Sequence, residues 1–564
     1  YPPRMTTIES SPDVTAAERS AVDVDAAAPS GTSSRLDALI EVFTSTDHKV
    51  IGRHYFAFGL VGLLDVIVVN VLLGIERIDG SDVALDADVI PQLIDAQRVG
   101  FVFVVLAPLA MAVAVAFVPL QIGARSIAFP RLAFTGFWMW LGGAVLTVVA
   151  LANNGGTLGG DSDMVDLFIT GIGLSAIGLT ATAGSVATSI LTTRAPDMTM
   201  RRVSASTWSA LVFSLGVVIV MPVLFGTLIY LFLDHRNART GFGGNEGILT
   251  WVGWMFTQPA TFLFAIPAVG LLTEIFPITF GRRTPARGVM YSGLALVGVA
   301  VLGAVTQQNI QNLPWSGSQL STADLDEKTR DLVPFILFNG LPVLGAMIVL
   351  LVALQIARPG AGMKVNVTPA VFYGFFGFGM VLVGMLGNLI HAIDDVALQG
   401  TVFEEATLVY IGYGAALGAM GALVHWAPKL WGRTVPAVPA IALAFAGVAA
   451  TVLAAFPLYI AGLLDQSAGV FYDDSDLQIW NILSLIGHGL MALTALAFVG
   501  LLVKTVVGSD DDEVGDDPWE GQTIEWATTS PAPRDNFVDV PVVHSAEPML
   551  DLREGSAPTE GSES

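Results

Sequence analysis

Few residues in this chain could hold a metal ion. Its 564 residues include seven histidines and no cysteine, which excludes disulfides, iron-sulfur clusters and copper-thiolate centres. A metal would therefore have to be bound by histidine, methionine or carboxylate side chains. The histidines are scattered along the chain, at His48, His54, His235, His391, His425, His488 and His544.

Three further polar residues lie inside long apolar stretches, namely Asp65, Asn70 and His488. An ionisable residue at membrane depth is costly, so it marks a proton or ion path or a paired partner. We predict a candidate intramembrane polar site at these three positions. The structural alternatives are a neutral, hydrogen-bonded carboxyl at Asp65 and an interhelical donor role for His488. The pair Glu404 and Glu405, ahead of a later apolar stretch, is interpreted as an external cap.

The composition places the chain in a lipid bilayer. Hydrophobic residues make up 53% and charged residues 13% of the sequence, and the mean hydropathy is +0.66. A membrane-spanning helix needs about 20 mostly apolar residues, and the sequence offers about twelve such stretches. We therefore predict an all-α, polytopic bundle of twelve transmembrane helices. The expected spans are Ile51 to Gly74, Val99 to Pro119, Leu132 to Leu151, Leu167 to Leu191, Trp208 to Leu233, Trp251 to Phe276, Val289 to Val305, Val333 to Ile356, Pro369 to Ala392, Ala406 to His425, Val438 to Leu464 and Ile479 to Val506.

Flanking segments complete the domain organisation. Residues 1–43 are rich in Ala, Ser, Asp and Thr and predict a disordered cytoplasmic tail, 44–507 form the membrane domain, and 508–564 predict an acidic, Pro/Ser-rich, solvated cytoplasmic tail. Arginine and lysine gather in the even-numbered loops, for example at Arg125, Arg194 and Arg283, so those loops and both termini should be cytoplasmic.

The formal charge of -23 is concentrated on the opposite face and in the two tails. This acidic outer face could attract a cationic electron carrier, with an ordinary solvated surface as the alternative. The sequence contains no basic stretch interleaved with aromatic residues, so nucleic acid is not an expected partner.

Several long motifs resemble subunit I of the haem-copper oxidases. The string STDHKVIGRHY (Ser45 to Tyr55) opens the first span, PLQIGARSIAFPRL (Pro119 to Leu132) follows the second, and LTTRAPDMTM (Leu191 to Met200) follows the fourth. Similar matches are WAPKLWG (Trp426 to Gly432), FPLYIAGL (Phe456 to Leu463) and the terminal DPWEGQTIEWATTSPAP (Asp517 to Pro533). The resemblance extends over roughly residues 44–543.

Membership of this family implies two haems and a copper ion held by six histidines, with oxygen reduction coupled to proton pumping. The matching positions carry other residues. The haem-ligand positions fall on Gln97, Ala406 and Leu408, and the copper-ligand positions on Gln258, Gln307 and Gln308. The family's proton-relaying Glu, cross-linked Tyr and channel Lys fall on Ala260, Phe262 and Leu351, and its propionate-binding Arg pair falls on Asp465 and Gln466. We therefore expect no haem, no copper and no catalytic residue.

The four glutamines could hydrogen-bond one another or fixed water and so fill a vacated polar cavity. The preferred hypothesis is a non-catalytic subunit or scaffold, a pseudoenzyme, in the aerobic respiratory chain of a bacterial plasma membrane. Expected partners are oxidase subunits II and III, a catalytic subunit I paralogue, and a cationic cytochrome c at the acidic face. An active terminal oxidase passing electrons from cytochrome c to oxygen, and an ion or proton transporter using the remodelled interior, remain alternatives.

Overall fold

The computed structural model describes residues 44–78, 85, 89–312, 332–333, 335–360, 365–393, 396–469, 475–508 and 514–555, without the side chains of 245–246, 302–312 and 475. The chain divides into two units, Tyr1–Ser45 and Thr46–Ser564, and all the elements below belong to the second. The predicted tail over 1–43 lies outside the described residues.

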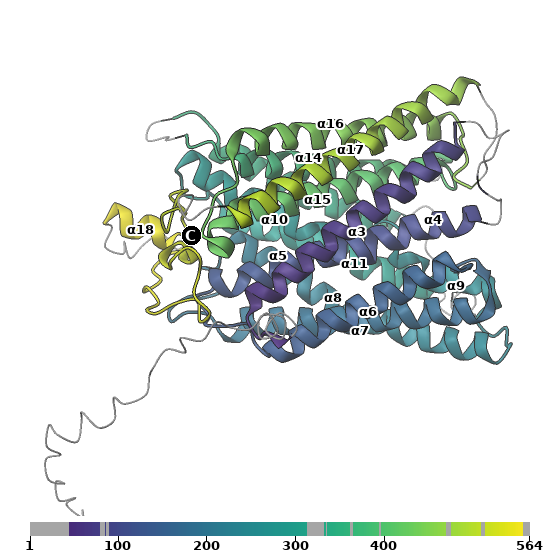
Figure 1. Cartoon of the computed structure of the whole chain (residues 1–564), viewed down its shortest axis with the longest axis horizontal. Coiled ribbons are helices and arrows are strands. Elements are labelled where there is room, and N and C mark those ends of the chain that lie inside the picture. The colour runs from purple at the N-terminus through teal and green to yellow at the C-terminus, as the bar shows by residue number, and fades with distance from the viewer. Residues whose placement is uncertain are drawn as a thin grey trace, which may run out of the picture. The chain divides into compact units, whose positions relative to one another are not determined.

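Helices account for nearly all of the described secondary structure, as the all-α prediction requires (Figure 1). The long helices are α3 (His48–Glu76), α6 (Pro130–Ala152), α7 (Ser162–Thr192), α8 (Ala205–Arg236), α10 (Phe262–Phe280), α11 (Arg287–Asn312), α13 (Leu341–Ile356), α14 (Pro369–His391), α15 (Val402–Trp431), α16 (Ala437–Leu463) and α17 (Ser475–Val507). One further span is continuous through α4 (Ile90–Val99), the π-helix η2 (Gly100–Leu106) and α5 (Ala107–Gln121). The short elements are α9 (Gly244–Val252), η3 (Gly253–Met255), η4 (Ile336–Gly340), η7 (Ile524–Ala527), α18 (Pro548–Glu554) and an antiparallel pair of two-residue strands, β1 (Gly155–Gly156) with β2 (Gly159–Gly160).

Among the described residues, eleven helices are long and apolar enough to cross a membrane. The twelfth predicted span, Val289 to Val305, lies in α11, of which Arg287–Val301 is described with its side chains and is apolar. The all-α polytopic bundle is therefore confirmed, with eleven helices among the described residues long and apolar enough to span a membrane where twelve were predicted. The sixth span differs from its prediction, because the stretch between Met255 and Phe262 is not helical and the spanning helix α10 begins only at Phe262.

Three helical segments form the centre of the bundle. Helices α10 and α15 are buried along their whole apolar length, and the segment from α4 to α5 nearly so, whereas the other spans expose one face. Small residues let the central helices approach closely: a Cβ placed on Gly418 of α15 would lie 2.6 Å from the Ala268 Cβ of α10. Nearly all the former ligand positions that the structure describes lie on or beside these three segments.

The C-terminal segment 514–555 packs against one end of the bundle instead of being solvated. Trp526 and Glu525 are fully buried, and Lys49 at the start of α3 donates hydrogen bonds to the Pro533 carbonyl and the Asn536 side chain, both at 2.9 Å. Composition alone suggested a solvated tail, and for these residues that expectation is wrong, because apolar and hydrogen-bonding side chains are interspersed among the charges.

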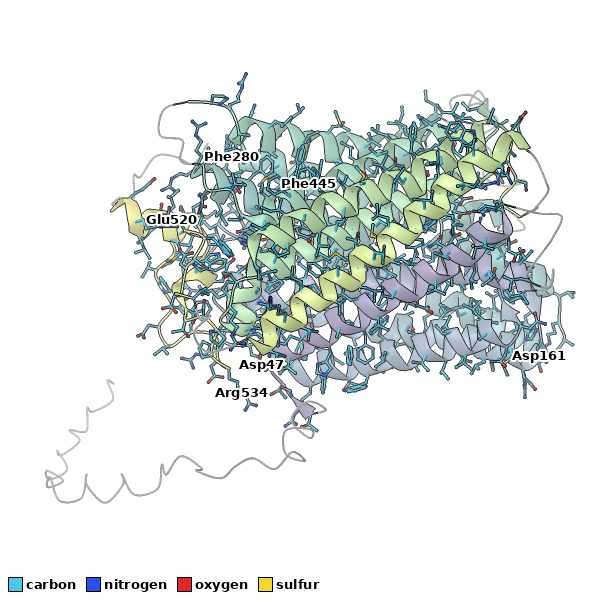
Figure 2. All side chains as sticks on the ribbon, turned by 45° about the horizontal axis from the view of Figure 1, so that its top comes forward. Asp47, Asp161, Phe280, Phe445, Glu520 and Arg534 are labelled. Atoms are coloured by element: carbon cyan, nitrogen blue, oxygen red, sulfur yellow. The ribbon has the colours of Figure 1, made fainter. Side chains whose placement is uncertain are left out.

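The first and the last described residues of the second unit therefore lie at the same end of the bundle. The chain between them must cross the bundle an even number of times. Figure 2 shows Asp47, Glu520 and Arg534 at this end and Asp161 at the other. Basic loops meet the segment here: Arg283 contacts Asp551 at 2.6 Å and Glu554 at 2.8 Å, and Arg202 donates to the Val543 carbonyl. The arginines that predict the cytoplasmic side are thus partly neutralised by the acidic C-terminal segment.

Removing the buried indole of this segment should release it. Trp526→Ala removes a side chain that packs against His425 (ring centroids 5.3 Å apart) and lies beneath the Lys429 ammonium, at a cost of about 3 to 5 kcal/mol. We expect faster limited proteolysis between 514 and 555. The control Val538→Ala alters a side chain that is 87% exposed in the same segment and should leave the cleavage rate unchanged. Equal rates for both variants would show that the segment is not held by this contact.

Docking of the segment should also depend on pH through Glu525. Burial raises the pKa of the Glu525 carboxyl. A carboxyl whose pKa is higher when folded supports folding most below its unfolded pKa, roughly 4.3, and less as the pH rises. Glu525→Gln removes this penalty, so the melting temperature of the variant minus that of the native protein should increase from acid to neutral pH. A difference that does not change with pH would contradict the assignment.

Candidate functional site

Gln97, at the first former haem-ligand position, lies in the last turn of α4, just before the π-helix η2. Its side chain is buried, and its amide donates to the Asn70 side-chain oxygen at 2.5 Å and to Glu405 Oε1 at 2.7 Å. Asn70 comes from α3, and Glu405 precedes Ala406 in the first turn of α15. The amide therefore connects three helices directly.

The same carboxylate forms an ion pair inside the bundle. Arg77, which directly follows α3, donates Nη1 to Glu405 Oε1 at 2.8 Å and Nη2 to Glu405 Oε2 at 2.6 Å. Their side chains are only 4% and 8% exposed. A bidentate arginine–carboxylate contact is the geometry that best offsets the desolvation of both charges. We call Arg77, Glu405, Gln97 and Asn70 the Arg77–Glu405 network.

Neighbouring polar residues join helix α17 to this network. Asn481 donates to the Arg77 carbonyl at 3.0 Å and accepts from Gln466 at 3.1 Å. Near them, His488 Nδ1 shares a 2.8 Å hydrogen bond with the Tyr413 hydroxyl. His488 is therefore an interhelical hydrogen-bonding residue, the structural role considered for it from the sequence. Each polar group lies where at least one protein partner compensates its burial.

Sequence reasoning missed the centre of this network. It treated Glu405 as an external cap, whereas the side chain is buried; only the adjacent Glu404, 3.7 Å from Arg98 and about one-fifth exposed, fits that description. Arg77 was not considered at all. The sequence did contain a signal for this pair: Arg77 directly follows one apolar span, and Glu405 directly precedes another apolar span.

None of the other former ligand positions carries a histidine. Ala406 is fully buried and Leu408 is 3% exposed, both apolar, and Ala260 and Phe262 are likewise buried. The Gln258 side-chain nitrogen is buried without a hydrogen-bonding partner among the described residues. The side chains of Gln307 and Gln308 lie outside the described residues. The expected contact among glutamines is thus not seen for Gln97, which bonds to Asn70 and Glu405 instead.

Three other predicted positions lie away from the interior. Asp65 is exposed on the outer surface of α3, so it does not join Asn70 and His488 in one site. Leu351 is 57% exposed on α13, which does not support a former channel position there. Asp465, expected to face haem propionates, is exposed after α16, whereas its neighbour Gln466 is buried.

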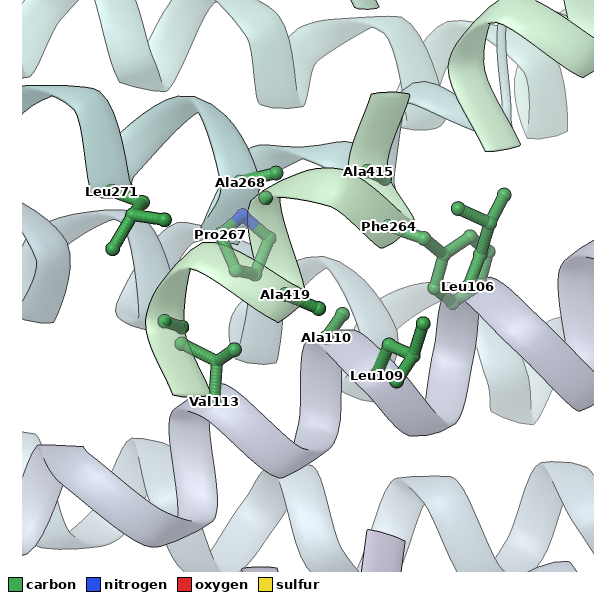
Figure 3. A pocket seen from close by; sticks show the side chains of 12 residues that line it. Leu106, Leu109, Ala110, Val113, Phe264, Pro267, Ala268, Leu271, Ala415 and Ala419 are labelled. Carbon is green, nitrogen blue, oxygen red and sulfur yellow. The ribbon is translucent and has the colours of Figure 1, made fainter. Parts of the chain in front are cut away.

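A small cavity lies between α5, α10 and α15 (Figure 3). Its lining is apolar and includes Leu106, Ala110, Phe264 and Ala415. About 10 Å³ is open to water-sized spheres, roughly enough for one water molecule, but the lining offers no polar side chain to hold it. The adjacent helix surfaces are closely packed.

Haem iron and copper need imidazole, thiolate or thioether donors. The described former ligand positions offer amides and aliphatic groups, and no three His, Asp or Glu side chains in the described part of the chain are grouped to hold a metal. Gln97 is already hydrogen-bonded to Glu405. These residues do not fit a haem or a copper ion, so we derive no chemical step through either.

If the Arg77–Glu405 network stabilises the bundle, a change within it should lower the thermal stability and a control change outside it should not. Gln97→Leu leaves the Asn70 side-chain oxygen without its donor and removes one of the three hydrogen bonds that Glu405 accepts, so it should cost about 1 to 3 kcal/mol. Gln258→Leu removes an amide nitrogen without a partner and should be nearly neutral, so it is the matched control. Thermal unfolding in detergent measures both. An unchanged Gln97→Leu, or an equal loss in both variants, would mean that the network does not stabilise the bundle.

Comparison with known proteins agrees with this architecture. The family profile for "Cytochrome C and Quinol oxidase polypeptide I" matches residues 50–308. A putative cytochrome c oxidase subunit 1-beta of Streptomyces avermitilis is 28% identical, over 91% of this chain and 92% of the relative. Cytochrome c oxidase subunit 1 of Bacillus subtilis is 27% identical, over 92% and 83%.

A haem-copper terminal oxidase dimer solved by cryo-EM shares the fold. Its TM-score is 0.60 at 13% sequence identity, and the match covers 92% of this chain and 89% of that one. The relatives are matched over most of their length. These comparisons support the haem-copper oxidase subunit I family, and the chain is a cytochrome c oxidase subunit I-like multi-pass membrane protein.

Proposed function

We propose that this protein is a haem- and copper-free subunit I homologue that serves as a non-catalytic structural subunit of a respiratory complex in a bacterial plasma membrane. The observation that carries the proposal is the direct contact of Gln97 with Glu405. In the family, haem ligands come from these two stretches of the chain. Here a hydrogen bond from the Gln97 amide to the Glu405 carboxylate joins the same two stretches, and Arg77 neutralises the charge of that carboxylate.

The family's expected partners follow from this proposal. Oxidase subunit I homologues function within multi-subunit complexes, so we propose subunits II and III or a catalytic paralogue as partners, with both termini cytoplasmic because the arginine-rich loops lie at their end of the bundle. Docking of a cationic cytochrome c has weaker support, since Asp163 and Asp166, at the start of α7, are partly neutralised by Arg236.

Haem content tests the proposal most simply. The chain is expressed and purified beside a catalytic subunit I relative under the same conditions, and haem per protein is measured by the pyridine haemochrome assay. We expect haem far below one per chain here and near the family's full content in the relative. Near-stoichiometric haem in this chain would refute the proposal.

Assembly needs a separate measurement. We expect the tagged chain, purified from native membranes in mild detergent, to enrich other oxidase subunits in a fixed ratio. The Gln97→Leu variant should co-purify less of them if the network supports the assembling surface. Recovery of the chain alone under conditions that keep a catalytic complex intact would contradict a structural role in such a complex.

A further inference from the structure

One face of α3 is exposed along most of its length. The exposed side chains include Phe58 (38%), Val61 (62%), Val68 (57%) and Ile75 (45%), with Asp65 exposed among them. Their separations, with Leu72 completing the series, alternate between three and four residues, which is the spacing that places side chains on one seam of a helix facing another helix. We call these residues the Asp65 seam.

Asp65 lies at the depth where a charge is most costly. It is three residues from the midpoint of the 29-residue helix, so it lies within about 4.5 Å of that midpoint along the axis. The interface is roughly 15 Å away on either side, half of a bilayer core of about 30 Å. An aspartate side chain is too short to reach it.

Nothing in the described part of the chain compensates this carboxyl. No hydrogen bond or ion pair involves Asp65, and the nearest polar residue along the helix, Asn70, is buried on another face in the Arg77–Glu405 network. Intramembrane carboxyls almost always face a bundle interior or pair with another group. Asp65 instead points away from its own bundle, so its partner must come from outside it.

We infer that the Asp65 seam is a docking surface for a transmembrane helix of another protein that carries an arginine or lysine at the middle of the membrane. Charge complementarity selects this occupant. A second copy docked through the same seam would bring two carboxyl groups together, and lipid tails offer nothing to pair with one. The flanking valines, phenylalanine and isoleucine would pack against apolar side chains of the partner helix, as in other membrane helix pairs.

The inference deepens the structural role proposed above and rests on it in naming the occupant as a subunit of the assembly. The surface itself does not depend on what the interior binds. A test restricted to the surface therefore separates the two. Haem in the interior together with selective docking at Asp65 would refute only the proposed function. No haem together with no selective docking at Asp65 would refute only the docking surface.

Synthetic transmembrane peptides of defined sequence provide the probe. Two leucine-rich helices of about 20 residues are compared in lipid vesicles, one with a single central arginine and one with leucine there. Because the chain has no cysteine, a donor dye can be placed at Val507→Cys, an exposed position on α17, and an acceptor on the peptide. We expect the full-length protein to bind the arginine peptide about three- to thirty-fold more tightly than the leucine peptide.

Three variants make the result specific to the carboxyl. Asp65→Leu should abolish the preference for arginine, Asp65→Lys should transfer it to a peptide with a central aspartate, and Val68→Leu, on the same seam, should retain it. Asp65 makes no hydrogen bond or ion pair with the residues that the structure describes, so Asp65→Leu should fold normally, which thermal unfolding checks. Equal binding of both peptides by the native protein, or a preference that survives Asp65→Leu, would overturn the inference. Energy transfer between two labelled copies of the protein that is stronger than the transfer to the arginine peptide would also overturn the inference, because it would indicate self-association.

Discussion

A carboxylate buried in a membrane bundle needs a counter-charge, and this constraint organises the interior of the protein. Glu405 is buried in the first turn of α15, and Arg77, arriving from the end of α3, pairs with both of its oxygens. Removing one partner of a buried pair typically costs about 3 to 5 kcal/mol, because the other charge is left uncompensated. Gln97, Asn70 and Asn481 are then arranged around this pair, so four helices have their relative positions fixed by one group of polar contacts.

Under the proposed function, this arrangement holds the central helices together where the family uses cofactors. In the family, haem and copper cross-link central helices through histidine. Here the central helices are joined by hydrogen bonds at one level and by close packing at another, as where Gly418 of α15 meets Ala268 of α10. The C-terminal segment packs against basic loops at one end of the bundle, for example where Asp551 pairs with Arg283.

The sequence predicted what depends on hydropathy and on motif register. Twelve apolar stretches predicted the polytopic bundle, and long motifs predict that Gln97, Ala406 and Leu408 occupy the haem-ligand positions. It did not predict which way each helix faces. In stretches such as Ile51 to Gly74, almost every residue is apolar, so no polar face shows its rotation about the axis. Asp65 was therefore grouped with Asn70, although they lie on different faces of α3. Glu405 and the C-terminal segment were misjudged because polar residues near the ends of spans look solvated unless their partners, distant in sequence, are known.

The central claim is that the Gln97 and Glu405 side chains contact each other directly between α4 and α15. An experimental density map of the purified protein in lipid nanodiscs, at a resolution that separates side chains, tests it without reference to activity. The account predicts continuous side-chain density joining Gln97, Glu405 and Arg77, with the amide nitrogen 2.7 Å from the carboxylate oxygen. Planar density of porphyrin size between α4 and α15, with Gln97 and Glu405 turned apart, would contradict it.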